Sequence, residues 1–172
     1  MIISLNPKIR VTPSLPSGTS IDVLPNSTYL SKHGFVMPVI VKTSSISCAP
    51  LLSAPLLSIP VMALFDTGAS RTCISDDIAN ALALKPVGFS KFYTASGKEV
   101  FADYTIDITF RSTEIKDFVN IKVGSCNMPY NHNLPDEQRM AEDNFGVLIG
   151  RDLMSKWNIV WNGPSSSVFI SE

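Results

Sequence analysis

Hydrophobic and polar residues alternate most clearly between residues 100 and 110. The apolar positions of this stretch are Val100, Ala102, Tyr104, Ile106, Ile108 and Phe110. Because successive side chains of a strand point to opposite faces of a sheet, this period of two predicts a long, half-buried strand. Residues 89–93 form a second candidate strand. The glycine and small residues at 94–98 between them predict a hairpin with a solvent-exposed tip.

Shorter apolar runs predict further strands, with two short helices between them. The runs are residues 35–42, 61–65, 72–74, 115–123, 145–150, 159–161 and 168–170. One helix is predicted after Ser75, which is a favoured cap, and before Pro86, which stops it. A second is predicted within residues 151–157. Many short strands separated by turns predict a mostly β fold, a barrel or a sandwich.

A length of 172 residues suits one domain with its own core and is too short for two large lobes. Residues 1–33 contain several Pro, Ser and Thr and show no apolar period, so they are predicted to form a loosely structured N-terminal extension or a pro-segment. The domain is assigned to residues 34–172. Within it, residues 124–144 are expected to form a surface insertion, with one helical turn at 136–142.

The stretch from Thr43 to Phe65 has no charged residue, which raises the question of a membrane span. Pro50, Pro55 and Pro60 interrupt it, and a helix would lose a backbone donor at each proline. We therefore expect a strand, an apolar loop and another strand, and no membrane partner. The first five residues also lack the charged region and long apolar segment of a signal peptide.

Composition indicates neither a charged partner nor a cofactor. Fourteen basic and 15 acidic residues give a net charge of −1, so no basic field attracts nucleic acid or anionic lipid. Cys48, Cys73 and Cys126 lack the spacing of a disulfide scaffold or a zinc site, and the chain has two histidines. We expect no metal or other cofactor, and a reducing, cytoplasmic location.

The apolar run 61–65 ends abruptly at an acid, in the sequence Asp66-Thr67-Gly68-Ala69. By itself, this acid is also explained as a strand-end residue that caps a turn, because Asp is favoured in turns. A second motif, Val147 to Asp152, follows ahead of the last predicted helix. With the hairpin between them, the two motifs resemble the retropepsin family of aspartic proteases. The resemblance covers residues 35–172.

This resemblance implies a closed β-barrel, one half of an acid protease, with one or two short helices and a homodimeric assembly. It implies that Asp66 is catalytic and that Thr67, Gly68 and Ala69 support the active site. The Thr67 hydroxyl would tie the two active-site loops together across the dimer axis. The residues implied to contact substrate at the hairpin tip are Thr94, Ala95, Ser96 and Gly97.

Peptide hydrolysis by this route needs two carboxylates that share one proton. One deprotonates the attacking water while the other protonates the carbonyl oxygen. This chain has one such motif, so the second carboxylate must come from another copy. A two-fold dimer supplies it, because an isologous interface brings the same residue of each subunit to the axis. The partners expected are therefore a second copy and a peptide or protein substrate.

The chain departs from the family pattern at one position. Many members place an acid directly after Asp-Thr-Gly-Ala, which pairs with the later Arg, whereas this chain has Ser70 followed by Arg71. Arg151 therefore lacks its expected partner. It pairs with Asp152 or another carboxylate, or the site is arranged differently.

Other reactive side chains have simpler explanations. Asp103, Asp107 and Asp152 are expected to be ordinary surface or helix-start acids. Cys73 is expected to be a small buried residue, because neither histidine lies in a motif typical of thiol proteases. Two functions remain: an aspartic-type endopeptidase that cuts extended peptides, and a module of the same fold that dimerises or binds peptide without cutting it.

Overall fold

The computed structural model describes residues 3–5, 34–44, 57–94, 97–110, 115–128, 130–135, 138, 144–162 and 167–171, and strands dominate them. The strands are β1 (Ile3–Leu5), β2 (Phe35–Thr43), β3 (Ser58–Phe65), β4 (Cys73–Ser75), β5 (Gly88–Thr94), β6 (Gly97–Thr109), β7 (Phe118–Cys126), β8 (Phe145–Ile149), β9 (Asn158–Asn162) and β10 (Ser167–Ser171). The described helices are α2 (Asp76–Ala81) and α4 (Arg151–Met154). The prediction of a mostly β fold with two short helices is confirmed.

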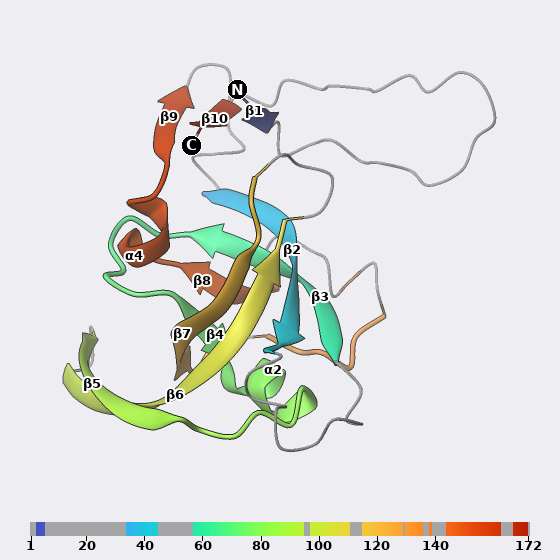
Figure 1. Ribbon diagram of the computed structural model, residues 1–172, viewed down its shortest axis with the longest axis vertical. Coiled ribbons are helices and arrows are strands. Elements are labelled where there is room, and N and C mark those ends of the chain that lie inside the picture. Colours follow the sequence, from blue (N-terminus) through green and yellow to red (C-terminus); the bar gives the residue numbers. More distant parts are fainter. Residues whose placement is uncertain are drawn as a thin grey trace.

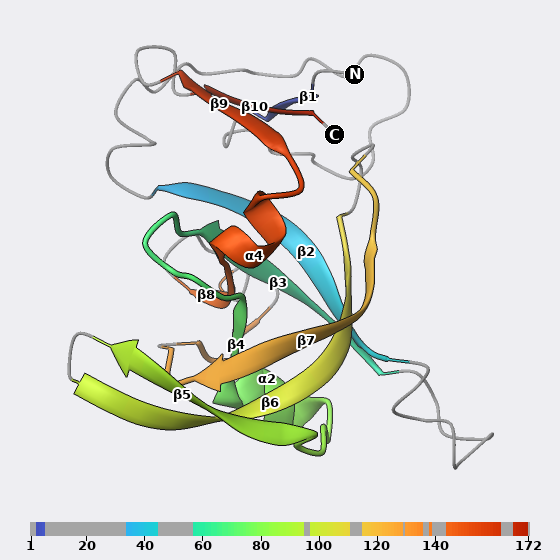
Figure 2. The same cartoon turned by 60° about the vertical axis from the view of Figure 1, so that its left-hand side comes forward.

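Six strands close into a barrel (Figure 1, Figure 2). Their order is β2-β3-β8-β4-β7-β6, and β6 returns to pair with β2, for example at Val41 and Ile108. Most pairs are antiparallel, but β3 with β8 and β4 with β7 are parallel. The predicted closed barrel is therefore confirmed, and β5 pairs with β6 outside the ring.

A three-stranded sheet lies at one end of the barrel (Figure 1, Figure 2). Its order is β1-β10-β9, with both pairs antiparallel. Val168 and Ile170 on its central strand are fully buried and belong to the same apolar core as the barrel strands. Because β1 pairs with β10, this sheet joins residues from near both ends of the sequence, and β1 was not predicted.

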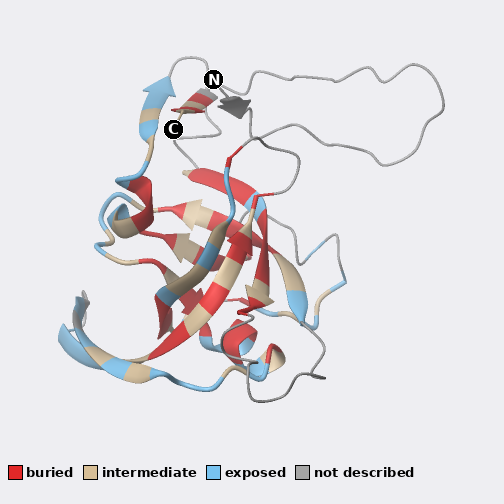
Figure 3. Cartoon of the chain, in the orientation of Figure 1, coloured by how far each residue is buried: buried red, intermediate tan, exposed pale blue. Residues whose placement is uncertain are grey.

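Apolar side chains of the barrel strands form one buried core, and Figure 3 marks the buried residues along these strands. On β6, Tyr104, Ile106 and Ile108 are buried, as the alternating pattern predicts. Burying one such isoleucine contributes roughly 1.5–3 kcal/mol. Trp157, after α4, packs its ring against the rings of Phe65, Phe110 and Phe118. These contacts attach the C-terminal segment to the barrel.

The hairpin of β5 and β6 runs beyond the barrel and is largely exposed (Figure 3). Phe89, Tyr93 and Val100 are 73%, 84% and 62% exposed. Opposite residues of a pair share one face of a sheet, and Val100 lies opposite Lys91, between Phe89 and Tyr93. The hairpin therefore carries several large apolar side chains on one exposed face.

Several predictions fall partly outside the described residues, among them the N-terminal extension or pro-segment over 1–33, which is described only at residues 3–5. The uncharged stretch 43–65 ends with β3, which is a strand as predicted, but residues 45–56 lie outside the description. The helical turn expected at 136–142 also lies outside it, apart from residue 138. No helix in the described part of the chain is long and apolar enough to cross a membrane.

Candidate active site

Asp66 stands where the buried strand β3 ends. Its N–H donates to the carbonyl oxygen of Ile149 at 3.0 Å, which extends the parallel pairing of β3 with β8 by one residue. Phe65 before it is buried and Thr67 after it is exposed, so the chain leaves the core at this point. Asp66 is therefore half-buried at the mouth of the barrel.

A tight turn fixes the direction of the Asp66 carboxylate. Its Oδ1 accepts the N–H of Gly68 at 2.7 Å, and the N–H of Ala69 donates to the Asp66 carbonyl at 3.2 Å. A Cβ on residue 68 would lie 3.0 Å from Oδ1, so glycine allows the turn to close on the carboxylate. The structure thus brings Asp66, Gly68 and Ala69 into one turn, with Thr67 exposed beside them.

The loop over residues 66–72 is held against the segment that joins β8 to α4. The N–H of Arg151 donates to the carbonyl of Ala69 at 3.0 Å. A Cβ on Gly150 would lie 2.3 Å from the carbonyl carbon of Arg71. Backbone atoms cannot turn aside as the end of a flexible side chain can, so this close approach requires glycine.

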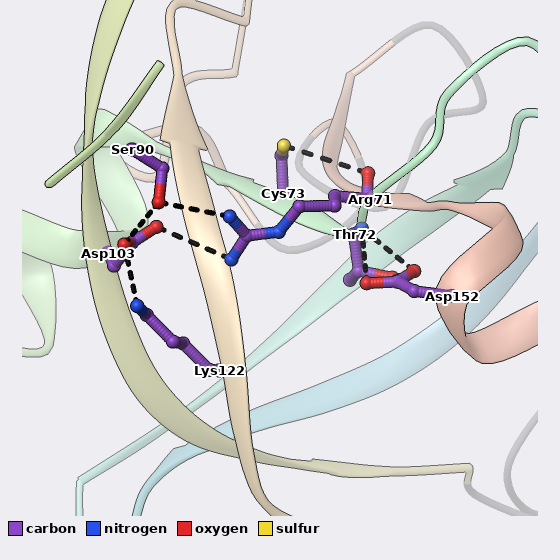
Figure 4. Close-up of polar contacts among 7 residues, drawn as sticks. All are labelled: Arg71, Thr72, Cys73, Ser90, Asp103, Lys122 and Asp152. Atoms are coloured by element: carbon purple, nitrogen blue, oxygen red, sulfur yellow. Dashed lines mark hydrogen bonds and ion pairs between the residues drawn. The ribbon is translucent and has the colours of Figure 1, made fainter. Parts of the chain in front are cut away.

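Thr72 joins the end of this loop to α4 through its side chain (Figure 4). The Asp152 carboxylate accepts the Thr72 N–H at 2.9 and 3.0 Å and the Thr72 hydroxyl at 2.8 Å. The same hydroxyl accepts the N–H of Gly150 at 3.1 Å. Because Thr72 is fully buried, these bonds are shielded from water and gain strength from the low local dielectric.

Asp152, not Arg151, makes the side-chain contact from α4 to the loop. The side chain of Arg151 is exposed, and this residue contacts the loop through its backbone N–H, which donates to the Ala69 carbonyl. Asp152 lies in the first turn of α4, so the prediction of a helix-start acid is confirmed. Its bonds to Thr72 give it a bracing role that the sequence did not indicate.

Arg71 reaches from the loop to the base of the β5–β6 hairpin (Figure 4). Its Nη1 donates to Ser90 Oγ at 3.1 Å, and its Nη2 lies 3.4 Å from Asp103 Oδ1. Ser90 Oγ donates to Asp103 Oδ2 at 2.6 Å, and Lys122 Nζ lies 2.8 Å from the same oxygen. The loop, β5, β6 and β7 therefore all meet at the Asp103 carboxylate.

The prediction that Asp103 is an ordinary surface acid is wrong. Its side chain is 0% exposed, and a buried carboxylate is tolerated because it is paired and hydrogen-bonded. Burial raises the pKa of Asp103, but the hydrogen bonds from Lys122 and Ser90 and the charge of Arg71 outweigh it, so the pKa is lowered. Asp107 is half-buried and accepts the N–H of Asn120 at 2.7 Å.

Cys73 and Cys126 lie on the neighbouring parallel strands β4 and β7, where Ser75 is opposite Cys126. Both are half-buried free thiols, so Cys73 is less buried than predicted. A hydrogen bond from Cys126 is the main cause that lowers the pKa of Cys73, while the same contact and burial raise the pKa of Cys126. The Cys73 thiol also donates to the carbonyl oxygen of Arg71 at 3.8 Å, beside the loop (Figure 4).

The hairpin tip is described in part. Thr94 pairs with Gly97, which closes the β5–β6 ladder, and Ala95 and Ser96 between them lie outside the described residues. Gly97 has φ = +122°, a conformation that favours glycine. In the described part of the chain, no group of three or more His, Cys, Asp or Glu is placed to hold a metal ion.

Sequence reasoning missed two contacts of the loop, Thr72 with Asp152 and Arg71 with Asp103. Thr72 begins a predicted strand and gives no separate signal. Asp103 occupies a polar position of an alternating strand, which predicts exposure. Arg71, which follows the Asp66 motif, was the one indication in the sequence that an acid would lie nearby to pair with it.

Comparisons with known proteins place these motifs in one matched region. A family model described as "Aspartyl protease" matches residues 56–153, which include the 66–72 loop, the hairpin and Asp152. A solved retropepsin-like aspartic protease from Rickettsia conorii is 18% identical, with a TM-score of 0.40, over 79% of this chain and 91% of that one. The Simian Foamy Virus (mac) protease is 12% identical, with a TM-score of 0.35, over 67% and 89%. No curated protein matches the chain.

Proposed function

Because this chain belongs to the aspartyl protease family, we propose that it cleaves peptide bonds with two carboxylates, one Asp66 from each subunit of a homodimer. One carboxylate takes a proton from the attacking water, and the other protonates the carbonyl oxygen of the scissile bond. Two like charges at close range cannot both ionise easily, so the pair shares one proton and holds an acid and a base together.

The turn around Asp66 carries this proposal. The Gly68 N–H fixes one carboxylate oxygen at 2.7 Å, so the acid has a defined direction at the mouth of the barrel. Thr67 and Gly68 beside it are exposed, which leaves this surface accessible to a partner. A carboxylate that is held in place but accessible suits proton transfer to a bound water.

The proposed surface for self-association is the sheet of β1, β10 and β9. Strand β9 lies at the edge of this sheet, and an edge strand presents backbone groups to which another strand can pair. Val160 and Trp161 on β9 are 60% and 49% exposed. Because these two neighbours point to opposite faces of the strand, each face of this edge carries an exposed apolar side chain that a second copy would cover. A two-fold axis beside this sheet would complete the dyad.

The proposed substrate is an extended peptide that lies between the loop and the β5–β6 hairpin. A hairpin offers backbone hydrogen bonds to an extended chain in the manner of an added strand. Residues Thr94, Ala95, Ser96 and Gly97 at its tip are proposed to contact the peptide. Closure of such a hairpin would exclude water from the reacting bond.

Digestion of a peptide library at mildly acidic pH tests the proposal. Wild type should cut between apolar residues, whereas Asp66→Asn should fold normally and lose at least about 100-fold in kcat/KM, because it removes the acid–base pair. Asp77→Asn, which changes an exposed acid on α2, is the matched control and should cut like wild type. Cleavage by Asp66→Asn at the wild-type rate would refute the proposal. Peptide binding without cleavage by wild type would support the non-catalytic module instead.

A further inference from the structure

We propose that Arg71 is a positioning residue for peptide hydrolysis, which clamps the base of the β5–β6 hairpin against the loop that carries Asp66. The Arg71 clamp consists of Arg71, Ser90 and Asp103. This inference rests on the proposed function, because it takes the hairpin to be the element that covers the bound peptide.

The clamp is a closed triangle of polar contacts (Figure 4). The Arg71 guanidinium contacts Ser90 on β5 at 3.1 Å and Asp103 on β6 at 3.4 Å, and Ser90 donates to Asp103 at 2.6 Å. A planar guanidinium that touches both strands restricts rotation of the hairpin as well as its distance from the loop. A lysine ammonium, which is a single nitrogen on a flexible side chain, would restrict only the distance between the hairpin and the loop.

Burial makes release of the clamp unfavourable. The Asp103 side chain is 0% exposed and that of Arg71 is 27% exposed. A charge pair in such surroundings is screened weakly by salt, and separating it would leave a buried carboxylate with fewer partners. The base of the hairpin is therefore expected to stay in place when the rest of the hairpin moves.

The main chain of Arg71 is fixed from the opposite side. Its carbonyl group lies against Gly150, and Thr72 next to it is bonded to Asp152. The guanidinium therefore connects two elements that are each fixed by other contacts. One is the loop, which is bonded to α4, and the other is the hairpin, which carries the buried Asp103 carboxylate. The position of the hairpin base relative to Asp66 is therefore set by this side chain together with the backbone pairing of Asp103 with Gly124 and the bond from the Gly124 N–H to the Thr72 carbonyl.

The hairpin continues beyond the clamp toward Thr94 and Gly97 (Figure 2). Its exposed part, which includes Tyr93 and Val100, would pivot about the fixed base. The clamp then sets the gap in which an extended peptide binds. Loosening it should weaken peptide binding more than it slows the chemical step, because Asp66 keeps its own turn.

Steady-state kinetics on three variants of the full chain test this inference. Arg71→Gln and Ser90→Ala should each raise KM about tenfold with kcat within about twofold of wild type, and Arg71→Lys, which keeps the charge, should fall between. Lys122→Gln is the matched control: it removes another partner of Asp103, from β7, without touching the link to the loop. It should lower the melting temperature and leave KM unchanged. An equal rise of KM in Arg71→Gln and Lys122→Gln would overturn the proposal.

Hydrogen exchange gives a readout that does not need cleavage. In the Asp66→Asn background, Arg71→Gln should speed exchange of the amides in 88–94 and 97–103 relative to Lys122→Gln. Unchanged exchange there would overturn the clamp even if wild type is active. Faster exchange, combined with a wild type that cuts no peptide, would support the clamp as a feature of the fold and would count against the proposed function alone.

Discussion

Replacing Thr72 by valine should weaken the fold and the candidate active site together. The hydroxyl of this fully buried residue donates to Asp152 Oδ1 at 2.8 Å and accepts the Gly150 N–H at 3.1 Å. Valine keeps the shape of threonine and removes both bonds. The backbone N–H of residue 72 can still donate to Asp152, so the change isolates the hydroxyl.

The expected loss follows from these two bonds. A hydrogen bond to a charged group contributes about 1.5–3 kcal/mol, and a buried N–H left without a partner costs about 1–3 kcal/mol. Part of this is offset because valine is more apolar than threonine. We expect the free energy of unfolding to fall by about 3 kcal/mol, which corresponds to roughly 6–12 °C in melting temperature for a chain of this size.

Urea denaturation and calorimetry measure this loss. Thr105→Val, on the half-buried face of β6, is the control and should change stability by less than about 0.5 kcal/mol. A double-mutant cycle with Asp152→Asn should give a coupling energy of at least about 1 kcal/mol, because the two side chains share a bond. A loss below about 1 kcal/mol, or additive single changes, would refute the bracing role of Thr72.

Three further predictions concern the dimer, the loop and pH. An equimolar mixture of wild type and Asp66→Asn, measured after subunit exchange, should keep about one quarter of the activity of wild type at the same total concentration, because only wild-type pairs hold two carboxylates. Retention of about one half of the activity would indicate independent subunits instead. Gly150→Ala should destabilise the fold by at least about 3 kcal/mol in urea titration, since its Cβ would lie 2.5 Å from the Arg71 carbonyl oxygen; a loss near zero would contradict the close approach. The pKa of Asp103 is lowered from 3.8 in the fold, so its ionised form stabilises the fold above that pH and this contribution is lost as pH falls through the folded-state pKa. Urea titrations should therefore show a constant stability gap between wild type and Asp103→Asn above about pH 5, which narrows as the pH falls below 3.8, and a gap that widens in acid would contradict the assignment.

Local patterns predicted the strands because each strand buries one face or both. The alternation marks the core face of β6 from Tyr104 onward, and the apolar run at 61–65 marks β3, which is buried between β2 and β8. The end of that run also located Asp66. The match to the aspartyl protease family confirms the prediction of an aspartic-type endopeptidase, which rested on two short motifs in order.

Pairing between distant segments could not be predicted from these patterns. The closure of the barrel through β2 and β6 and the pairing of β1 with β10 depend on residues far apart in sequence. Burial of Asp103 depends on Arg71, Ser90 and Lys122, which three different elements supply. A period of two reports the face on which a side chain lies, but not what covers that face.

With Ser70 and Arg71 after Asp-Thr-Gly-Ala, the loop of this chain is held by two side-chain contacts that point in different directions. The acid that bonds to the loop is Asp152 on α4, and the cation that extends from the loop is Arg71. Asp152 bonds to Thr72, and Arg71 contacts the hairpin at Asp103. These two contacts fix the loop from both sides. Because the carboxylate that receives Arg71 comes from β6, the loop that carries Asp66 and the hairpin proposed to cover the peptide are held in one buried network.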